Sequence, residues 1–154
     1  MVGRVKLSRR RVLALAGSIA VTGFLPSRDG AAAAPKDVEI LIDLSQQSMD
    51  VMLHGDHAYH WKVSTARPGY RTPVGRFRPY RLERVWFSIK YDNAPMPHSI
   101  FFLGGYAIHG TTEIRKLGRP VSHGCIRLHP DNARILFGLV RQAGMTNTGI
   151  TIQR

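Results

Sequence analysis

The chain contains a single cysteine, Cys125, within the segment Ser122-His123-Gly124-Cys125-Ile126-Arg127. A lone thiol cannot form an intramolecular disulfide, so the fold must be held together by its own core. A nucleophilic cysteine needs a base and nearby backbone N–H groups that can bind an oxyanion. The neighbouring histidines and glycine satisfy that requirement. A buried cysteine that acts as a small apolar residue is equally compatible with this local sequence.

The first 34 residues have the three parts of an export signal. The basic head includes Arg9 and Arg10, an apolar stretch of 14 residues covers positions 12–25, and four alanines precede Pro35. A membrane-spanning helix needs about 20 apolar residues. We therefore expect a cleavable signal over residues 1–34 and no stable membrane anchor. The paired arginines resemble a twin-arginine motif, and the general secretory route remains the alternative.

Charge indicates the partners of the remaining domain. The whole chain has a formal charge of +12, and residues 1–34 hold six basic residues and one acidic residue, which leaves +7 on residues 35–154. A basic exported domain is attracted to anionic cell-envelope polymers. Export and the lack of a recognised binding motif argue against nucleic acid as a partner. The 120 residues are enough for one compact domain.

Alternating β-branched and polar residues predict a mainly β fold of antiparallel strands. One substantial helix is predicted from Pro130 to Gly144, because proline suits the first helical position and an apolar stripe at helical spacing follows. Two prolines and two glycines predict a shaped loop over residues 67–75. The expected strands are Val38 to Asp43, Met49 to Leu53, Ala58 to Ser64, Leu82 to Tyr91, Ser99 to Leu103, Tyr106 to Ile108 and Ile150 to Gln153.

A second histidine precedes the cysteine segment at a defined distance. His109 lies sixteen residues before Cys125. Here the chain resembles the L,D-transpeptidase catalytic domain family of bacterial cell-wall enzymes, whose signature is a histidine, a spacer of this length, then Ser/Thr-His-Gly-Cys, an apolar residue and Arg or Asn. The Thr-Pro-Val-Gly-Arg-Phe segment at 72–77 resembles another element of that family. The resemblance covers residues 38–154 and implies an antiparallel β-sandwich or barrel-like fold with a C-terminal helix.

The resemblance implies a reaction on peptidoglycan stem peptides, which serve as acyl donor and acceptor. A thioester forms at Cys125 with release of D-alanine, and an amine of a neighbouring stem resolves it into a cross-link. Such an enzyme works in the periplasm or cell wall, in cell-wall biogenesis and cell shape, without a cofactor or catalytic metal. Two related outcomes keep the same site. Water as acceptor would make an L,D-carboxypeptidase, and a protein lysine would make a protein-to-wall anchoring enzyme.

The resemblance also implies roles for individual residues. His109 is the base that takes the thiol proton, with its other ring nitrogen held by a backbone carbonyl such as that of Gly110. A partner of this kind is expected to lower the pKa of the thiol. The backbone N–H groups of Gly124 and Cys125 are expected to bind the oxyanion.

Three further residues of the motif have open or lesser roles. Arg127 either grips a substrate carboxylate or forms a structural salt bridge. His123 is expected to order the cysteine turn or the substrate, and Ser122 to hydrogen-bond within the turn.

Two non-catalytic interpretations of the sequence compete with the catalytic one. A zinc site could use His109, His123, Cys125 and His129, although the spacing is tight and Arg127 would bring positive charge close to the metal. A non-catalytic wall-binding module would explain export and charge, but not the Cys/His pattern.

Overall fold

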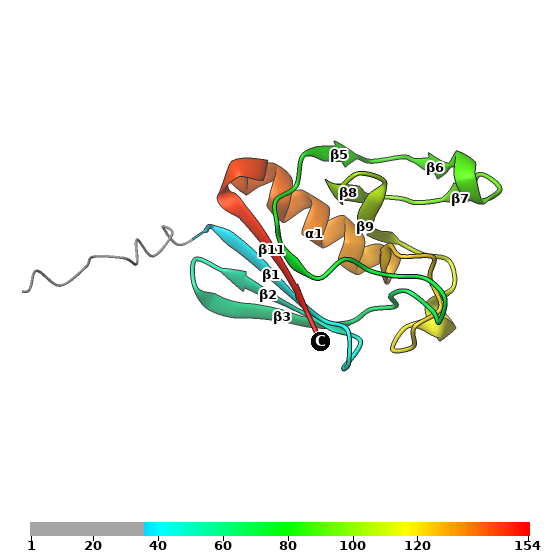
Figure 1. Cartoon of the computed structure of the whole chain (residues 1–154). Coiled ribbons are helices and arrows are strands. Elements are labelled where there is room, and N and C mark those ends of the chain that lie inside the picture. Colours follow the sequence, from blue (N-terminus) through cyan, green and yellow to red (C-terminus); the bar gives the residue numbers. More distant parts are fainter. Residues whose placement is uncertain (1–35) are drawn as a thin grey trace, which may run out of the picture. The chain divides into compact units, whose positions relative to one another are not determined.

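A computed structural model describes residues 36–154 of the chain, and the expected export signal lies outside the described residues. A five-stranded sheet has the order β3-β2-β1-β11-β4, so the first and last described strands are neighbours (Figure 1). Its strands are β1 (Val38–Asp43), β2 (Ser48–Leu53), β3 (Asp56–Lys62), β4 (Gly75–Phe77) and β11 (Thr148–Gln153).

A second sheet has four strands in the order β10-β9-β8-β5. These are β5 (Arg81–Glu83), β8 (Ser99–Leu103), β9 (Tyr106–Gly110) and β10 (Ile126–Leu128). A separate two-stranded ribbon pairs β6 (Phe87–Ser88) with β7 (Ala94–Pro95). The mainly β architecture predicted from the sequence is confirmed.

The sheets are mixed rather than purely antiparallel. β1 pairs with β11 in parallel, and β9 pairs with β10 in parallel. β10 is only three residues long and follows the cysteine directly, and it was not predicted from the sequence. The loop between β9 and β10 returns the chain to the start of β9, so both strands run in the same direction.

The predicted helix is confirmed as α1 (Pro130–Ala143). The His129 side chain accepts a hydrogen bond from the Asp131 N–H at 3.3 Å, so this histidine caps the helix. α1 packs against β9, β8 and β1 (Figure 1). One core cluster joins α1 to both sheets; its buried members include Ile40, Ile42, Val51, Ile100, Ile108, Ile126, Leu128, Leu136, Val140, Ile150 and Ile152.

The long strand predicted from Leu82 to Tyr91 is wrong. The segment divides into β5, β6 and the 3₁₀ helix η1 (Ile89–Tyr91). Its apolar residues looked like a buried strand, yet Val85 is 65% and Ile89 87% exposed. The β6–β7 hairpin lies at one end of the domain, away from the five-stranded sheet (Figure 1). No helix of residues 36–154 is long and apolar enough to cross a membrane.

Candidate active site

The parallel β9–β10 pair brings the two halves of the sequence motif together. His109 lies near the end of β9, and Cys125 immediately precedes β10. Arg127 is the register partner of His109 on the neighbouring strand. The fifteen residues between His109 and Cys125 thus contain the loop that connects two adjacent parallel strands.

Hydrogen bonds from two buried hydroxyl groups hold the cysteine turn. The Ser122 hydroxyl donates to the carbonyl oxygen of Cys125 at 2.7 Å and accepts the N–H of Gly124 at 3.0 Å. Thr72, from the Thr-Pro-Val-Gly segment, donates to the Gly124 carbonyl at 2.9 Å and accepts the Ala66 N–H at 3.1 Å. The second family-like element therefore has a physical role, because its threonine fixes the backbone beside the cysteine.

Gly124 has no room for a side chain. Its φ angle is +131°, which residues with a side chain rarely adopt. A Cβ atom there would lie 2.6 Å from the Tyr106 ring and 2.9 Å from the Arg71 carbonyl oxygen.

The oxyanion site in the structure differs in one respect from the site expected from the sequence. The Gly124 N–H is already bound to the Ser122 hydroxyl. Within residues 36–154, the Cys125 N–H donates to no protein acceptor. Of the two N–H groups expected to bind an oxyanion, only that of Cys125 is free, because the serine that shapes the turn uses the other.

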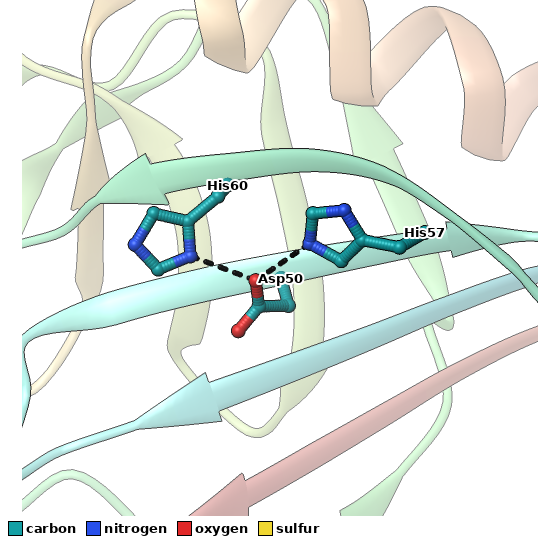
Figure 2. A group of neighbouring side chains, drawn as sticks. All are labelled: Asp50, His57 and His60. Carbon is teal, nitrogen blue, oxygen red and sulfur yellow. Dashed lines mark hydrogen bonds and ion pairs between the residues drawn. The ribbon is translucent and has the colours of Figure 1, made fainter.

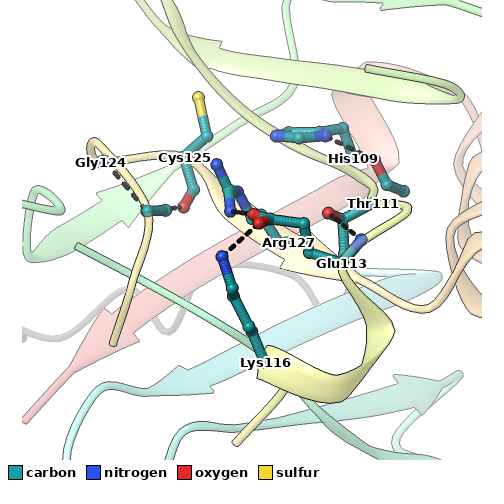
Figure 3. A network of polar contacts seen from close by, with 9 residues as sticks. His109, Thr111, Glu113, Lys116, Gly124, Cys125 and Arg127 are labelled. Atoms are coloured by element: carbon teal, nitrogen blue, oxygen red, sulfur yellow. Dashed lines mark hydrogen bonds and ion pairs between the residues drawn. The ribbon is translucent and has the colours of Figure 1, made fainter. Parts of the chain in front are cut away.

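His109 is buried, with 6% of its surface exposed. Its Nδ1 bonds to the Gly110 carbonyl at 2.7 Å, as expected from the sequence. A carbonyl only accepts, so Nδ1 carries the proton, and Nε2 is left as an acceptor on the side where Cys125 lies (Figure 3). Burial lowers the pKa of His109 to about 4, against the opposing effect of the Gly110 hydrogen bond. The imidazole is therefore neutral at neutral pH.

Cys125 is not bonded to His109 in this arrangement. Its sulfur lies 3.8 Å from the Gly105 carbonyl oxygen, and the described residues contain no hydrogen bond between Sγ and the imidazole. Burial raises the pKa of the Cys125 thiol, although the Ala107 backbone and the Arg127 charge act in the opposite direction. This direction is opposite to the one expected from the sequence. Thiol and imidazole are both neutral at neutral pH.

The raised pKa predicts a specific pH profile for thiol alkylation. Only the thiolate reacts rapidly, so a higher pKa moves the rise in rate to higher pH. We expect the rate at which iodoacetamide alkylates native Cys125 to reach half its maximum at a certain pH. This pH should be higher than the corresponding pH for the same protein unfolded in urea. A plateau that persists below pH 7 in the native protein would instead demonstrate a thiolate–imidazolium pair.

Arg127 forms a salt bridge, one of the two roles left open by the sequence. Its guanidinium donates to Glu113 at 2.5 Å, and Glu113 also binds Lys116 (Figure 3). The hydrogen bond from Lys116, together with the Arg127 charge, lowers the pKa of Glu113. Glu113 was not identified from the sequence. It is the only acidic residue between His109 and Cys125, and this feature could have indicated it as the partner of Arg127.

His123 lies between two aromatic rings. Its imidazole stacks on Tyr91 with ring centroids 4.3 Å apart, and Tyr70 meets it edge-on at 4.7 Å. Burial first, and then the Arg67 charge, lower the pKa of His123. The ring therefore links the loop at 67–75 and the β6–β7 hairpin to the cysteine turn. Neither tyrosine was singled out from the sequence.

A cavity of about 590 Å³ contains the proposed motif residues His109, Ser122, His123, Cys125 and Arg127. The β6–β7 hairpin forms one wall and the loop after β9 another, through Trp86, Ile89, Tyr91, Met96, Thr112 and Glu113. A smaller cavity of about 370 Å³ beside α1 is lined by Arg84, His98 and Arg134 and has no nucleophile. The larger cavity is the candidate active site.

The structure does not assemble the alternative zinc site. His129 caps α1, and His123 lies between the tyrosines. Within the part of the chain that the structure describes, the one group of at least three converging ligand atoms lies elsewhere, at Asp50, His57 and His60.

The sequence of residues 37–150 matches the family model YkuD, described as L,D-transpeptidase catalytic domain. No curated protein matches the chain. Among solved structures, an L,D-transpeptidase from Mycobacterium smegmatis is 22% identical with a TM-score of 0.68, and the alignment covers 77% of this chain and 59% of that one.

Two further solved structures are similar. An L,D-transpeptidase from Stackebrandtia nassauensis is 25% identical with a TM-score of 0.67, and the alignment covers 82% of this chain and 60% of that one. L,D-transpeptidase 3 from Mycobacterium tuberculosis, in complex with a faropenem-derived adduct, is 22% identical with a TM-score of 0.66, covering 77% and 61%. The chain thus spans about three fifths of the length of these structures.

Proposed function

Because the chain belongs to the L,D-transpeptidase catalytic domain family, we propose that it transfers acyl groups between peptidoglycan stem peptides through a thioester at Cys125. The observation that carries the proposal is the cavity itself. It contains the only cysteine of the chain and a buried imidazole with a free acceptor nitrogen. A nucleophile beside a base in a substrate-sized cavity is the minimum that covalent acyl transfer requires.

In this proposal the reaction starts from a neutral pair. The Cys125 side chain rotates from Gly105 towards His109, whose Nε2 accepts the thiol proton while Sγ attacks the carbonyl carbon of the donor peptide. The low pKa of about 4 makes the imidazolium short-lived, because a buried cation is costly. His109 therefore passes its proton readily to the leaving amine of D-alanine.

The tetrahedral intermediate carries negative charge on the former carbonyl oxygen. The Cys125 N–H is free to bind this oxygen, and a donor of this kind is worth about 3 kcal/mol in the transition state. Gly124 contributes its N–H only if the Ser122 hydroxyl releases it. Arg127 acts as a positioning residue, because Glu113 already occupies its guanidinium.

The second half-reaction restores the enzyme. An amine of a neighbouring stem attacks the thioester carbonyl, the C–N bond forms, the C–S bond breaks, and His109 accepts the amine proton and returns one to sulfur. The Gly110 carbonyl holds the imidazole in the tautomer that both steps need.

Export is part of the proposal, since peptidoglycan lies outside the cytoplasm. Residues 1–34 are proposed to be the signal and residues 35–154 the catalytic domain, which acts in the periplasm or cell wall. The +7 charge of that domain favours contact with anionic envelope polymers. Cleavage within the four alanines at 31–34 is expected. An intact Met1 end on protein isolated from cells would refute it.

The function is tested by incubating the purified protein with a tetrapeptide-stem muropeptide and measuring product masses. Cross-linked dimers with loss of D-alanine are expected, and Cys125→Ala abolishes them. Tripeptide alone would identify water as the acceptor, and tripeptide joined to an added lysine peptide would identify a protein-anchoring activity. An unchanged muropeptide under all these conditions would refute acyl transfer.

A carbapenem-type β-lactam is expected to acylate Cys125. The strained lactam carbonyl resembles the donor amide, so sulfur attack breaks the ring C–N bond and the opened drug stays attached. L,D-transpeptidase 3 from Mycobacterium tuberculosis, which shares this fold, is in complex with a faropenem-derived adduct. Intact-mass spectrometry should record one added drug mass per chain and none on Cys125→Ala. An adduct that persists on Cys125→Ala would place the nucleophile elsewhere.

A further inference from the structure

Three potential metal ligands converge on one face of the β2–β3 hairpin. The Asp50 oxygen Oδ1 lies 2.9 Å from His57 Nε2 and 2.7 Å from His60 Nδ1, so both rings point at a single carboxylate oxygen (Figure 2). The three ligand atoms all lie within 4.8 Å of one another. None of these residues lines the active-site cavity.

A β-bulge creates this convergence. Asp50 pairs with His60 and Met52 with His57, and the register shifts between Val51 and Met52. Residues two apart on a strand share a face, so the cross-strand partners of Asp50 and Met52 also share one. In a regular ladder the residue opposite Met52 would be Ala58. The extra residue in β3 therefore places His57 on the same face as His60, which is how bulges re-aim side chains.

We propose that Asp50, His57 and His60 bind one divalent transition-metal ion, of the class represented by Zn²⁺. Two imidazole nitrogens and one carboxylate oxygen suit zinc, copper or nickel, whereas magnesium and calcium prefer an all-oxygen shell. The ion lies between the rings and replaces the two hydrogen bonds to Asp50. Water fills the remaining coordination positions, because the hairpin face is open to solvent.

The distances fit such an ion after small side-chain movements. Zinc bonds to nitrogen and oxygen at about 2.1 Å, so neighbouring ligand atoms of a tetrahedral site lie about 3.4 Å apart. The present spacing of 2.7–2.9 Å from Asp50 Oδ1 to each ring nitrogen must widen slightly, and all three ligand atoms already lie within 4.8 Å of one another. The side chains of His57 and His60 are 53% and 60% exposed, so both rings can rotate without disturbing the core.

The position of the hairpin in the sheet also favours the site. β3 is an edge strand of the five-stranded sheet, joined to the sheet only through β2. An ion bound to Asp50 of β2 and to both histidines of β3 cross-links the edge strand to its neighbour and stabilises the hairpin.

ZnCl₂ is titrated by calorimetry into the purified Cys125→Ser protein, here called the host protein. The serine is used so that the catalytic thiol cannot bind the ion. One ion per chain is expected, with no heat from MgCl₂. His57→Gln and His60→Gln should each weaken the affinity at least tenfold, and Asp50→Asn several-fold. Zinc should also raise the unfolding temperature of the host protein but not that of His60→Gln.

The matched control is His54→Gln, at the tip of the same hairpin, where the ring lies 3.6 Å from Asp37. It should bind zinc as the host does. All the replaced side chains are surface groups, and circular dichroism checks that each variant is folded. Absence of binding to the host, or binding that His57→Gln and His60→Gln leave unchanged, would overturn the proposal. Neither result bears on acyl transfer at Cys125.

Discussion

Replacing Gly124 by alanine is expected to destabilise the protein by about 2–5 kcal/mol, from overpacking and backbone strain together. The new Cβ would lie 2.6 Å from the Tyr106 ring and 2.9 Å from the Arg71 carbonyl oxygen. The tyrosine ring can move, but the backbone carbonyl cannot move without shifting the loop. This loss is a large fraction of the total stability of a typical domain, which is about 5–15 kcal/mol. Urea unfolding at pH 7 measures it, and acyl transfer is expected to fall with it.

Gly138→Ala is the matched control. Gly138 lies within α1, and an added Cβ would have no atom within 4 Å. The same substitution should therefore stabilise the protein, by about 0.5–1 kcal/mol, because glycine is a poor helix former. If both alanine variants unfold at the same urea concentration, the close packing described around the cysteine turn is wrong.

His109→Gln is expected to lower acyl transfer about 100-fold or more, the usual effect of losing a general base. Glutamine keeps a side-chain donor for the Gly110 carbonyl but cannot take up the thiol proton. The pH profile of thiol alkylation should change little, since the structure contains no ion pair for the substitution to remove. If His123→Gln abolishes turnover while His109→Gln retains it, the roles of the two histidines must be exchanged.

The same variant is expected to remove part of the acid sensitivity of the fold. The pKa of His109 is about 4 in the folded protein and 6.5 in the unfolded chain. Between these values the unfolded state binds the extra proton, so stability falls as the pH drops from 6.5 to 4, by about 3 kcal/mol in total. Urea unfolding at pH 7, 5.5 and 4.5 should give a steeper loss for wild type than for His109→Gln. Parallel curves would contradict the buried neutral imidazole.

The motif could be predicted because it is local. His109, Ser122 and Cys125 occupy fixed positions along the chain, and the fold brings all three to one cavity. The helix could be predicted equally well, since proline, an apolar stripe and a terminal glycine are signals within one segment. Most strands followed from local alternation, but the short strands β4 and β10 and the segment around β6 did not.

Properties that depend on distant segments could not be predicted. The parallel pairing of β9 with β10 depends on how the spacer loop turns. The partners Glu113 and Tyr91 reach the site only through that loop and the β6–β7 hairpin. The thiol pKa was expected in the wrong direction, because sequence spacing gives the neighbours of a group but not its burial, which here has the largest effect. The hydrogen bond from Gly124 to Ser122 likewise required the geometry of the turn.

The most direct test of the account is the mass of the protein itself during turnover. The purified protein is mixed with a tetrapeptide-stem muropeptide, quenched in acid within seconds and measured by intact-mass and peptide-level spectrometry. We predict a transient adduct on Cys125 whose mass is that of the donor without its terminal D-alanine and that disappears when acceptor amine is added. Product formation by Cys125→Ala at the wild-type rate, or an adduct on another residue, would contradict the account.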